Sequence, residues 1–373
     1  MVMVGTGGTG AFVNGQQCSC PSGGVVMDHY DNIGIPGYAL YYFRRPEVQY
    51  KIGHPNPNVT MAVIVSHGAA RNAEDYFCYM QNSVDSYFGA NRDAVLVFAP
   101  WFAGPEDNPA PNQIYWASDG GWKWCDLSTK NITKRTSSCT MLDSVAQNLA
   151  DRNIYPSLKT IVLTGHSAGG QIAQRYALGT PVTEMLQAKG LTLRYVPNNP
   201  STYAYLDNSR PYPDPISPNC SNYCIAQEIP TIQWTFKPTI DTQLFSCVGT
   251  YNDWGYGLEK KNNYMSQTSN PNMIQRYPSR TVIYGLGAAD VCNSMFGCGC
   301  DDEDLDASCP ADAQGWCRFA RGYAWFNYLN WFYKVPVHAM AVCPGVSHDG
   351  CAMLQCPQIQ AAIFTGQSTT QGA

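Results

Sequence analysis

Charged side chains are scarce in this chain. Only 14% of its 373 residues are Asp, Glu, Lys or Arg, and the formal net charge is −5. No stretch gathers lysine and arginine into the basic stripe that nucleic-acid binding requires, and none forms an arginine-rich helix suited to a membrane surface. No apolar run approaches the ~20 residues of a membrane-spanning helix. We therefore predict neither a nucleic-acid nor a membrane partner, and we expect a monomer.

The N-terminus also lacks the charged start and long apolar core of a signal peptide, so secretion has to be argued from other features. Sixteen cysteines, an even number that is high for this length, favour an oxidising compartment. Asn58, Asn131 and Asn219 each begin an Asn-x-Ser/Thr sequon, which predicts N-glycosylation. We predict a secreted, disulfide-bonded glycoprotein.

The cysteine pairing cannot be deduced from so many candidates; the local bridges Cys125–Cys139 and Cys220–Cys224 are hypotheses. A zinc site is the alternative, but neither Cys220–Cys224 nor Cys298-Gly-Cys300 has the paired Cys-x-x-Cys spacing. The acidic run 301–306 is either a solvated loop or a calcium site. We predict no organic cofactor and no metal centre, with calcium at that run left open.

Short apolar, β-branched runs alternate with helical patterns along the chain. Strands are predicted at 61–66, 94–99, 160–164, 191–196, 281–284 and 337–342, a hairpin at 38–43 and 47–52, and helices at 141–150, 170–188 and 320–332. This alternation predicts an α/β fold, a doubly wound and mostly parallel sheet, in one domain over 1–373.

One region, 197–280, breaks the alternation and is rich in Pro, Asn, Tyr and Ser. We interpret it as a disulfide-rich cap or lid insertion over the C-terminal edge of the strands, where open α/β sheets bind ligands. The alternative is a disulfide-pinned surface insertion far from any pocket.

The strongest local pattern is Gly165-His166-Ser167-Ala168-Gly169, which follows an apolar run and opens a small-residue helix. A serine on such a strand-to-helix turn has its hydroxyl exposed, and the glycines permit the tight backbone. We predict Ser167 as a nucleophile. The alternative is a glycine-bracketed serine in an ordinary turn.

A serine nucleophile needs a base and an acid that orients it. Asp290 follows the strand at 281–284, and His348 lies in the loop after the last strand. Ser167, Asp290, His348 is the order in which such a triad occurs on this architecture. The competing acids lie in the run 301–306. Among the other histidines, we expect His166 to point away from the nucleophile.

The strand at 61–66 ends in His67-Gly68-Ala69-Ala70-Arg71-Asn72. A His-Gly turn at this place aims backbone N–H groups at a developing oxyanion. We predict the amides of Ala168 and Ala69 as the donors, with Gly68 and Ala70 as alternatives to Ala69.

Together these motifs resemble the α/β-hydrolase superfamily, specifically secreted esterase-like members with a His-Gly-x-x-Arg-Asn oxyanion loop. The resemblance spans about residues 38–364 and rests on Ser66–Asn72, Gly165–Gly169, Asn199–Tyr203 and Pro344–Gly350. It implies an eight-stranded sheet and acyl-enzyme hydrolysis through Ser167, Asp290 and His348. The segment 305–321 also resembles a recurring part of such enzymes, without indicating its role.

We accordingly predict a serine carboxylic-ester hydrolase acting on a small or polymer-attached ester. Phenolic, acetyl, lipid and polyester substrates stay open, as do a peptidase or amidase on the same triad and a non-catalytic binding protein. Aromatic residues near the expected pocket, Trp101, Trp116, Trp122 and Tyr203, either stack on substrate or pack the cap against the sheet.

Overall fold

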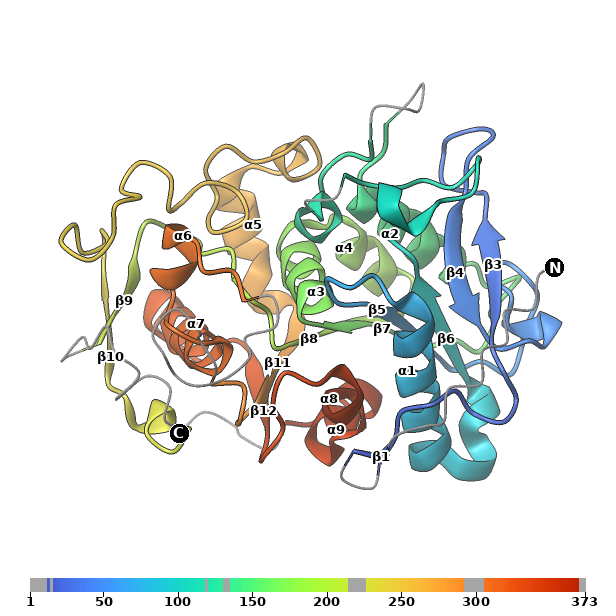
Figure 1. Ribbon diagram of the computed structural model, residues 1–373. Coiled ribbons are helices and arrows are strands. Elements are labelled where there is room, and N and C mark those ends of the chain that lie inside the picture. Colours follow the sequence, from blue (N-terminus) through green and yellow to red (C-terminus); the bar gives the residue numbers. More distant parts are fainter. Residues whose placement is uncertain are drawn as a thin grey trace.

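The computed structural model describes residues 12–13, 16–117, 120–129, 135–213, 226–291 and 305–368. At its centre is an eight-stranded sheet (Figure 1). In spatial order the strands are β12 (Ala339–Cys343), β11 (Thr281–Gly287), β8 (Thr192–Asn198), β7 (Thr160–His166), β5 (Met61–Ser66), β6 (Val95–Pro100), β4 (Leu40–Arg44) and β3 (Val26–Tyr30). The strands from β12 to β6 run parallel to one another. At the edge, β4 pairs antiparallel with β6, and β3 pairs antiparallel with β4. The predicted doubly wound, mostly parallel sheet is confirmed.

Helices cover both faces of the sheet (Figure 1). One face packs against α1 (Ala73–Phe88), α8 (Gly350–Gln355) and α9 (Pro357–Phe364), and the other against α2 (Ser138–Leu149), α3 (Ala168–Gly179), α4 (Val182–Ala188) and α7 (Arg318–Tyr333). Along β5, Ala62 and Ile64 face one core while Val63 and Val65 face the other. Because successive strand side chains point to opposite faces, a continuous apolar run is what a doubly covered strand requires.

The edge of the sheet differs from the prediction. Residues 47–52 form no strand but contain the short 3₁₀ helix η1 (Val48–Tyr50), and the antiparallel neighbour of β4 is β3. The reason is the turn after β4, where the Arg44 guanidinium donates to the carbonyls of Arg45, Pro46 and Glu47. The helix predicted at 170–188 is also two helices, because the chain leaves the helical path at Thr180 before Pro181.

The region 197–280 begins inside β8. It continues through an antiparallel ribbon of β9 (Arg210–Pro213) and β10 (Trp234–Lys237), then α5 (Asn270–Arg276). Its loop is fastened to the 3₁₀ helix η4 (Gly121–Trp124), since Trp254 Nε1 and Asn262 Nδ2 both donate to the Trp124 carbonyl at 2.8 and 2.7 Å. Its role as a cap stays a prediction.

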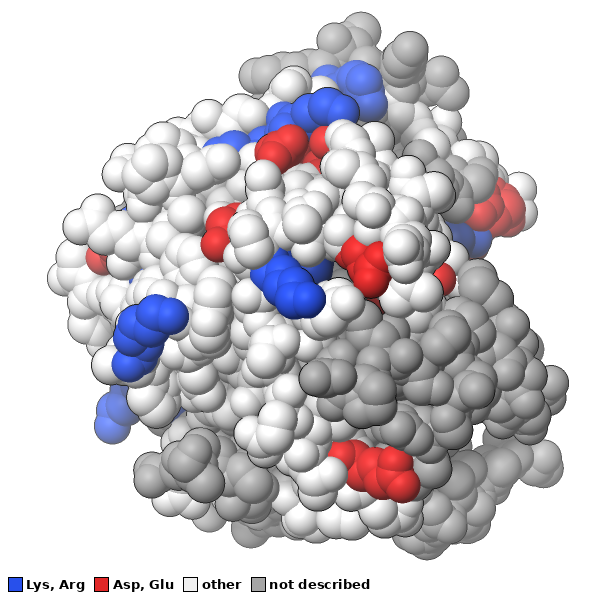
Figure 2. All heavy atoms as spheres, turned by 90° about the vertical axis from the view of Figure 1, so that its left-hand side faces the viewer, with Lys and Arg blue, Asp and Glu red and all other residues white. Residues whose placement is uncertain are grey.

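The end of the molecule at β9, β10 and the short helix α6 (Cys309–Asp312) lies far from β3 (Figure 1). On that side the charged side chains are scattered over a mostly uncharged surface (Figure 2). None of the helices in the described residues is both long and apolar enough to cross a membrane.

Five disulfides join described residues: Cys18–Cys351, Cys20–Cys78, Cys125–Cys139, Cys247–Cys309 and Cys343–Cys356. The hypothesis Cys125–Cys139 is confirmed. The pair Cys220–Cys224, the cysteines Cys298 and Cys300, the sequons at Asn131 and Asn219 and most of the acidic run lie outside the described residues. Asn58 is exposed, as an acceptor of glycan has to be.

Candidate active site

Ser167 stands on a sharp turn between β7, which ends at His166, and α3, which begins at Ala168. Its backbone has φ +58° and ψ −118°, a conformation that costs a non-glycine residue energy and that clusters at functional sites. A Cβ on Gly165 would lie 2.6 Å from the Gly169 carbonyl carbon, and one on Gly169 would lie 2.3 Å from the Ser66 oxygen. The elbow therefore requires both glycines.

Asp290 and His348 meet at the same edge of the sheet. Asp290 follows β11 and His348 follows β12, which is the parallel neighbour of β11. The His348 Nδ1–Asp290 Oδ2 distance is 2.7 Å, and the Asp290 side chain is fully buried. Because an ionised carboxylate only accepts, Nδ1 is assigned the proton, and Nε2 keeps the lone pair that a general base needs. Of the competing acids, Asp306 instead accepts from Tyr256, and 301–304 lie outside the described part of the chain.

Arg318, at the start of α7, is a partner of Asp290 that sequence reasoning missed. Its Nη1 lies 3.6 Å from Asp290 Oδ1, and both side chains are buried. The next backbone amide, of Phe319, donates to the Asp290 carbonyl at 3.0 Å. At the start of α7, the Arg318 side chain and the Phe319 backbone amide thus both hold Asp290 in place.

His166, the neighbour of Ser167 in the chain, packs against the candidate base. The ring centroids of His166 and His348 are 4.3 Å apart, and His166 Nδ1 is 3.0 Å from the Tyr76 hydroxyl. Burial, with smaller contributions from His348 and Arg318, holds the pKa of His166 well below its usual range. The His166 ring therefore packs on His348 without adding a positive charge beside it. We expected only that His166 would point away from Ser167, and its contact with His348 was not predicted.

The predicted oxyanion loop lies beside the nucleophile, because a Cβ on Gly68 would be 3.8 Å from Ser167 Cβ. His67 fixes the loop: its Nε2 accepts from the Phe102 amide at 3.0 Å, so Nδ1 carries the proton and donates to the Gly68 carbonyl at 2.9 Å. Burial lowers the pKa of His67 to about 4, which keeps this arrangement neutral. Ala168 is the first residue of α3, so its N–H has no partner inside the helix.

Arg71 anchors the far end of the same loop. It has φ +58°, and its guanidinium lies 2.6 Å from Glu106 and 2.6 Å from Asp107. A third contact, 3.4 Å from Nη1 to the Ala69 carbonyl, reaches back into the loop. These interactions hold Ala69 close to the elbow.

The loop that carries His348 is braced on both sides by disulfides. Cys343, the last residue of β12, is bonded to Cys356, and Cys351, in α8, is bonded to Cys18. Since His348 lies between Cys343 and Cys351 in the sequence, the bridges restrict how far its loop can move.

The segment 305–321 now has a structural role. Gln314 accepts from the Tyr203 amide and donates to the Tyr203 carbonyl, each at 2.8 Å. Arg321, paired with Asp312 at 3.0 Å, donates to the Ser201 carbonyl at 2.7 Å. The segment therefore ties the chain after β8 to α7.

The four aromatic residues singled out in the sequence separate into two groups. Trp116, Trp122 and Tyr203 are buried: Trp122 packs against His67 with ring centroids 4.6 Å apart, and Tyr203 stacks on Trp325 at 5.3 Å. Their burial favours the packing alternative, and their contact with substrate stays a prediction. Trp101, after β6, is partly exposed and lines a cavity of about 390 Å³ next to Arg71.

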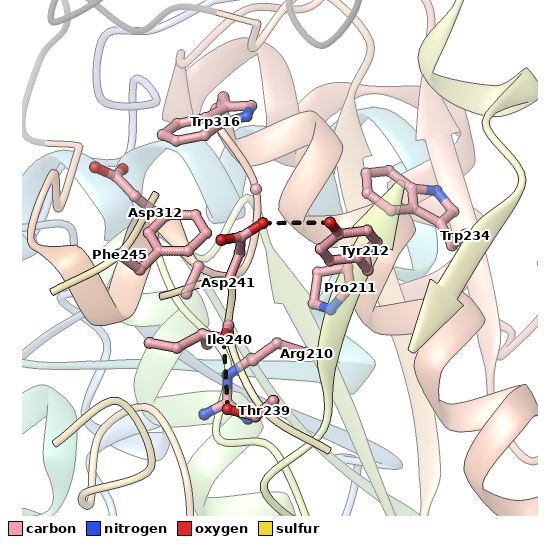
Figure 3. A pocket seen from close by; sticks show the side chains of 12 residues that line it. Arg210, Pro211, Tyr212, Trp234, Thr239, Ile240, Asp241, Phe245, Asp312 and Trp316 are labelled. Atoms are coloured by element: carbon pink, nitrogen blue, oxygen red, sulfur yellow. Dashed lines mark hydrogen bonds between the residues drawn. The ribbon is translucent and has the colours of Figure 1, made fainter. Parts of the chain in front are cut away.

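A second cavity, of about 30 Å³, lies beside β9 and β10 (Figure 3). Arg210, Trp234, Phe245 and Trp316 are in its wall, and Tyr212 donates to Asp241 across 3.2 Å. The space accommodates about one or two water molecules. It is too small for a substrate. Within the described residues, His, Cys, Asp and Glu form no group of three that could hold a metal ion.

No protein-family model and no curated protein sequence matches the chain. Among solved structures it is similar to LpqC, a poly(3-hydroxybutyrate) depolymerase from Bordetella parapertussis, with TM-score 0.56 and 17% identity over 93% of this chain and 92% of that one. It is also similar to poly(aspartic acid) hydrolase-1 from Sphingomonas sp. KT-1, with TM-score 0.57 and 16% identity over 91% and 98% of the two chains. With the sheet order and the elbow described above, these similarities show that the chain has the α/β-hydrolase fold.

Proposed function

We propose that this protein is a serine hydrolase that cleaves carboxylic esters through an acyl-enzyme. Ser167 attacks the acyl carbonyl, and His348 Nε2 takes its proton and returns it to the departing alcohol. Asp290 holds the imidazole and stabilises its protonated form. Water then attacks the acyl-enzyme: His348 takes a proton from the water and returns it to Ser167 as the acid leaves. The observation that carries this proposal is the 2.7 Å contact between His348 and the buried Asp290. The His348 ring also packs on His166, which directly precedes Ser167 at φ +58°.

In this mechanism the amides of Ala168 and Ala69 donate to the oxyanion. Both lie on backbone that the fold holds in place: Ala168 at the start of α3, and Ala69 between the His67 and Arg71 anchors. Each such donor typically stabilises the transition state by about 3–4 kcal/mol, because it needs no reorganisation as charge develops.

Replacement of Ser167 with alanine tests this function. We expect kcat for p-nitrophenyl acetate to fall by roughly 10⁴–10⁶-fold, since the remaining groups supply only oxyanion binding. Labelling by a fluorophosphonate probe should also be lost. Ser22→Ala, at an exposed site, is the matched control. Hydrolysis by Ser167→Ala within tenfold of the wild-type rate would contradict the proposal.

The preference for esters over amides needs its own measurement. We propose short-acyl, long-acyl and aromatic esters, poly(3-hydroxybutyrate), poly(aspartic acid) and a peptide anilide as one panel, because the two similar structures act on polymers. Turnover of the peptide anilide with none of the esters would favour the amidase alternative. Trp101 is the aromatic residue best placed to contact substrate, since it is partly exposed and lines the larger cavity, of about 390 Å³. Trp116 lines another cavity, of about 290 Å³, but its side chain is buried.

Secretion is part of the proposal. Five disulfides in the described residues and an exposed Asn58 sequon support it. Expression in a eukaryotic secretory host should give a protein whose mass falls after glycan removal. Recovery of fully reduced, unglycosylated and active protein from the native source would oppose an extracellular location.

A further inference from the structure

The cavity of about 390 Å³ lies at the same edge of the sheet as the candidate triad. We call it the Trp101 cavity and define it by Val25, Met27, Phe43, Glu74, Asp75 and Trp101. Trp101 directly follows β6, and the two acidic residues are in the first turn of α1. Its volume lies within the range of small-ligand sites, about 300–1,000 Å³.

The Trp101 cavity is within reach of a substrate held at Ser167. Gly68 lies against Ser167, and Arg71, which also lines the cavity, is three residues further along the chain. The Arg71 amide donates to the Gly68 carbonyl at 3.2 Å, so the two residues close a turn whose ends lie less than about 7 Å apart. A group several bonds from the scissile ester can therefore reach the cavity.

One wall of the cavity is apolar and aromatic. Phe43 and Trp101 have ring centroids 6.1 Å apart, and Met27 is 42% exposed. Trp101 Nε1 is buried and has no hydrogen-bond partner among the described residues. Aromatic faces and a thioether attract apolar groups, and aromatic faces also attract cations.

Two acidic side chains, Glu74 and Asp75, also line the cavity. Asp75 accepts from Asn72 Nδ2 at 2.9 Å, whereas Glu74 makes no hydrogen bond or ion pair with any described residue. Burial and the neighbouring Asp75 raise the pKa of Glu74, which indicates a carboxylate without a cationic partner. The nearby cation, Arg71, is already held by Glu106 and Asp107. Glu74 and Asp75 also interact favourably with the partial positive charge at the N-terminus of α1, but this interaction leaves their negative charges at the cavity.

We propose that the Trp101 cavity binds the non-scissile part of the ester and selects an apolar group that carries a positive charge, such as a quaternary ammonium, over its neutral isostere. This inference rests on the proposed function of Ser167. The aromatic wall excludes water from the alkyl groups, and Glu74 supplies the opposite charge.

A pair of isosteric thioesters tests the selection. Acetylthiocholine and 3,3-dimethylbutyl thioacetate differ in charge but hardly in shape. We expect kcat/KM to be about tenfold higher for the cation, equal to about 1.4 kcal/mol, and the ratio to fall as salt screens the charge. Glu74→Gln should bring the ratio close to one. Glu228→Gln, an exposed carboxylate elsewhere on the chain, should leave the ratio unchanged.

A binding measurement separates this inference from the proposed function. The Ser167→Ala variant should bind phenyltrimethylammonium in calorimetry, and adding Glu74→Gln or Trp101→Leu should weaken that binding by at least fivefold. If neither thioester is hydrolysed but this binding is seen, the cavity assignment stands and the esterase proposal fails. If the thioesters are hydrolysed equally well and the cation does not bind, the inference is overturned.

Discussion

Replacement of Asp290 with asparagine tests the catalytic geometry in the most detail. Asp290 accepts the His348 Nδ1 proton at 2.7 Å in a fully buried position. An asparagine amide can present its NH₂ group to Nδ1, which shifts the imidazole proton to Nε2 and removes the base. From the equivalent change in another serine hydrolase we expect kcat/KM to fall by roughly 10³–10⁴-fold, or about 4–5.5 kcal/mol.

The same replacement should also reduce stability. It neutralises the carboxylate that lies 3.6 Å from the buried Arg318 guanidinium. Breaking a buried ion pair by removing one partner costs about 3–5 kcal/mol, because the other charge stays buried. Urea denaturation followed by tryptophan fluorescence measures this loss, and the kinetic assay is run under conditions where both proteins are folded.

Asp312→Asn is the matched control. Asp312 is also a buried aspartate paired with a buried arginine, Arg321, at 3.0 Å, but it touches none of the triad residues. We expect a similar loss of stability with kcat/KM retained within about threefold. Asp290→Asn retaining kcat/KM within tenfold of wild type, or Asp312→Asn losing as much activity as Asp290→Asn, would refute the reasoning.

Three further predictions follow from the packing. Gly169→Ala should destabilise the fold by at least about 1–3 kcal/mol, measured as a lower Tm, because its Cβ would lie 2.3 Å from the Ser66 oxygen. Burial, opposed by hydrogen bonds from Tyr176 and other hydroxyls, raises the pKa of Asp143 from 3.8 to about 6. A raised folded-state pKa gives stability that is complete below pH 3.8 and is lost as the pH rises through about 6. The wild type should therefore lose about 3 kcal/mol between pH 4 and 7 relative to Asp143→Asn in urea titrations. Removing the Cys343–Cys356 bridge, whose cysteines are 13 residues apart, by a double change to serine should cost about 3 kcal/mol and lower kcat, because the His348 loop loses a constraint.

Controls for these predictions are available in the chain. Gly249→Ala has open space around its Cβ and should leave Tm unchanged. Removing the Cys247–Cys309 bridge should lower stability without the loss of kcat expected for the Cys343–Cys356 variant. An unchanged Tm in Gly169→Ala, parallel pH profiles for wild type and Asp143→Asn, or equal kcat losses in the two bridge variants would contradict the respective prediction.

Much of the fold could be predicted because its signals are local. A doubly covered parallel strand requires an apolar run, and β5, β6 and β7 each show one. The elbow was readable because the glycines at 165 and 169 flank the serine within one short segment. The positions of Asp290 and His348 followed from the rule that parallel strands bring their carboxyl ends to one edge.

The sequence did not indicate the contacts that packing makes between distant segments of the chain. Residues 47–52 have a strand-like pattern, but the Arg44 contacts turn that stretch away, and β3 pairs with β4. Three of the five disulfides described join segments that lie far apart in the sequence, and no spacing rule indicates that these segments are close. A fourth, Cys343–Cys356, spans a short segment that has no recognisable pattern.

The sequence by itself determined the six parallel strands at the centre of the sheet and which three side chains follow them at its edge, because periodicity and turn chemistry act over a few residues. Only the tertiary structure decided that Arg318 contacts Asp290, that His166 packs on His348, and that Trp101 lines a cavity while Trp122 is buried. Those outcomes depend on how α7, β7 and β6 pack against one another, and side-chain packing is set by the three-dimensional neighbours of a residue rather than by its neighbours in the chain.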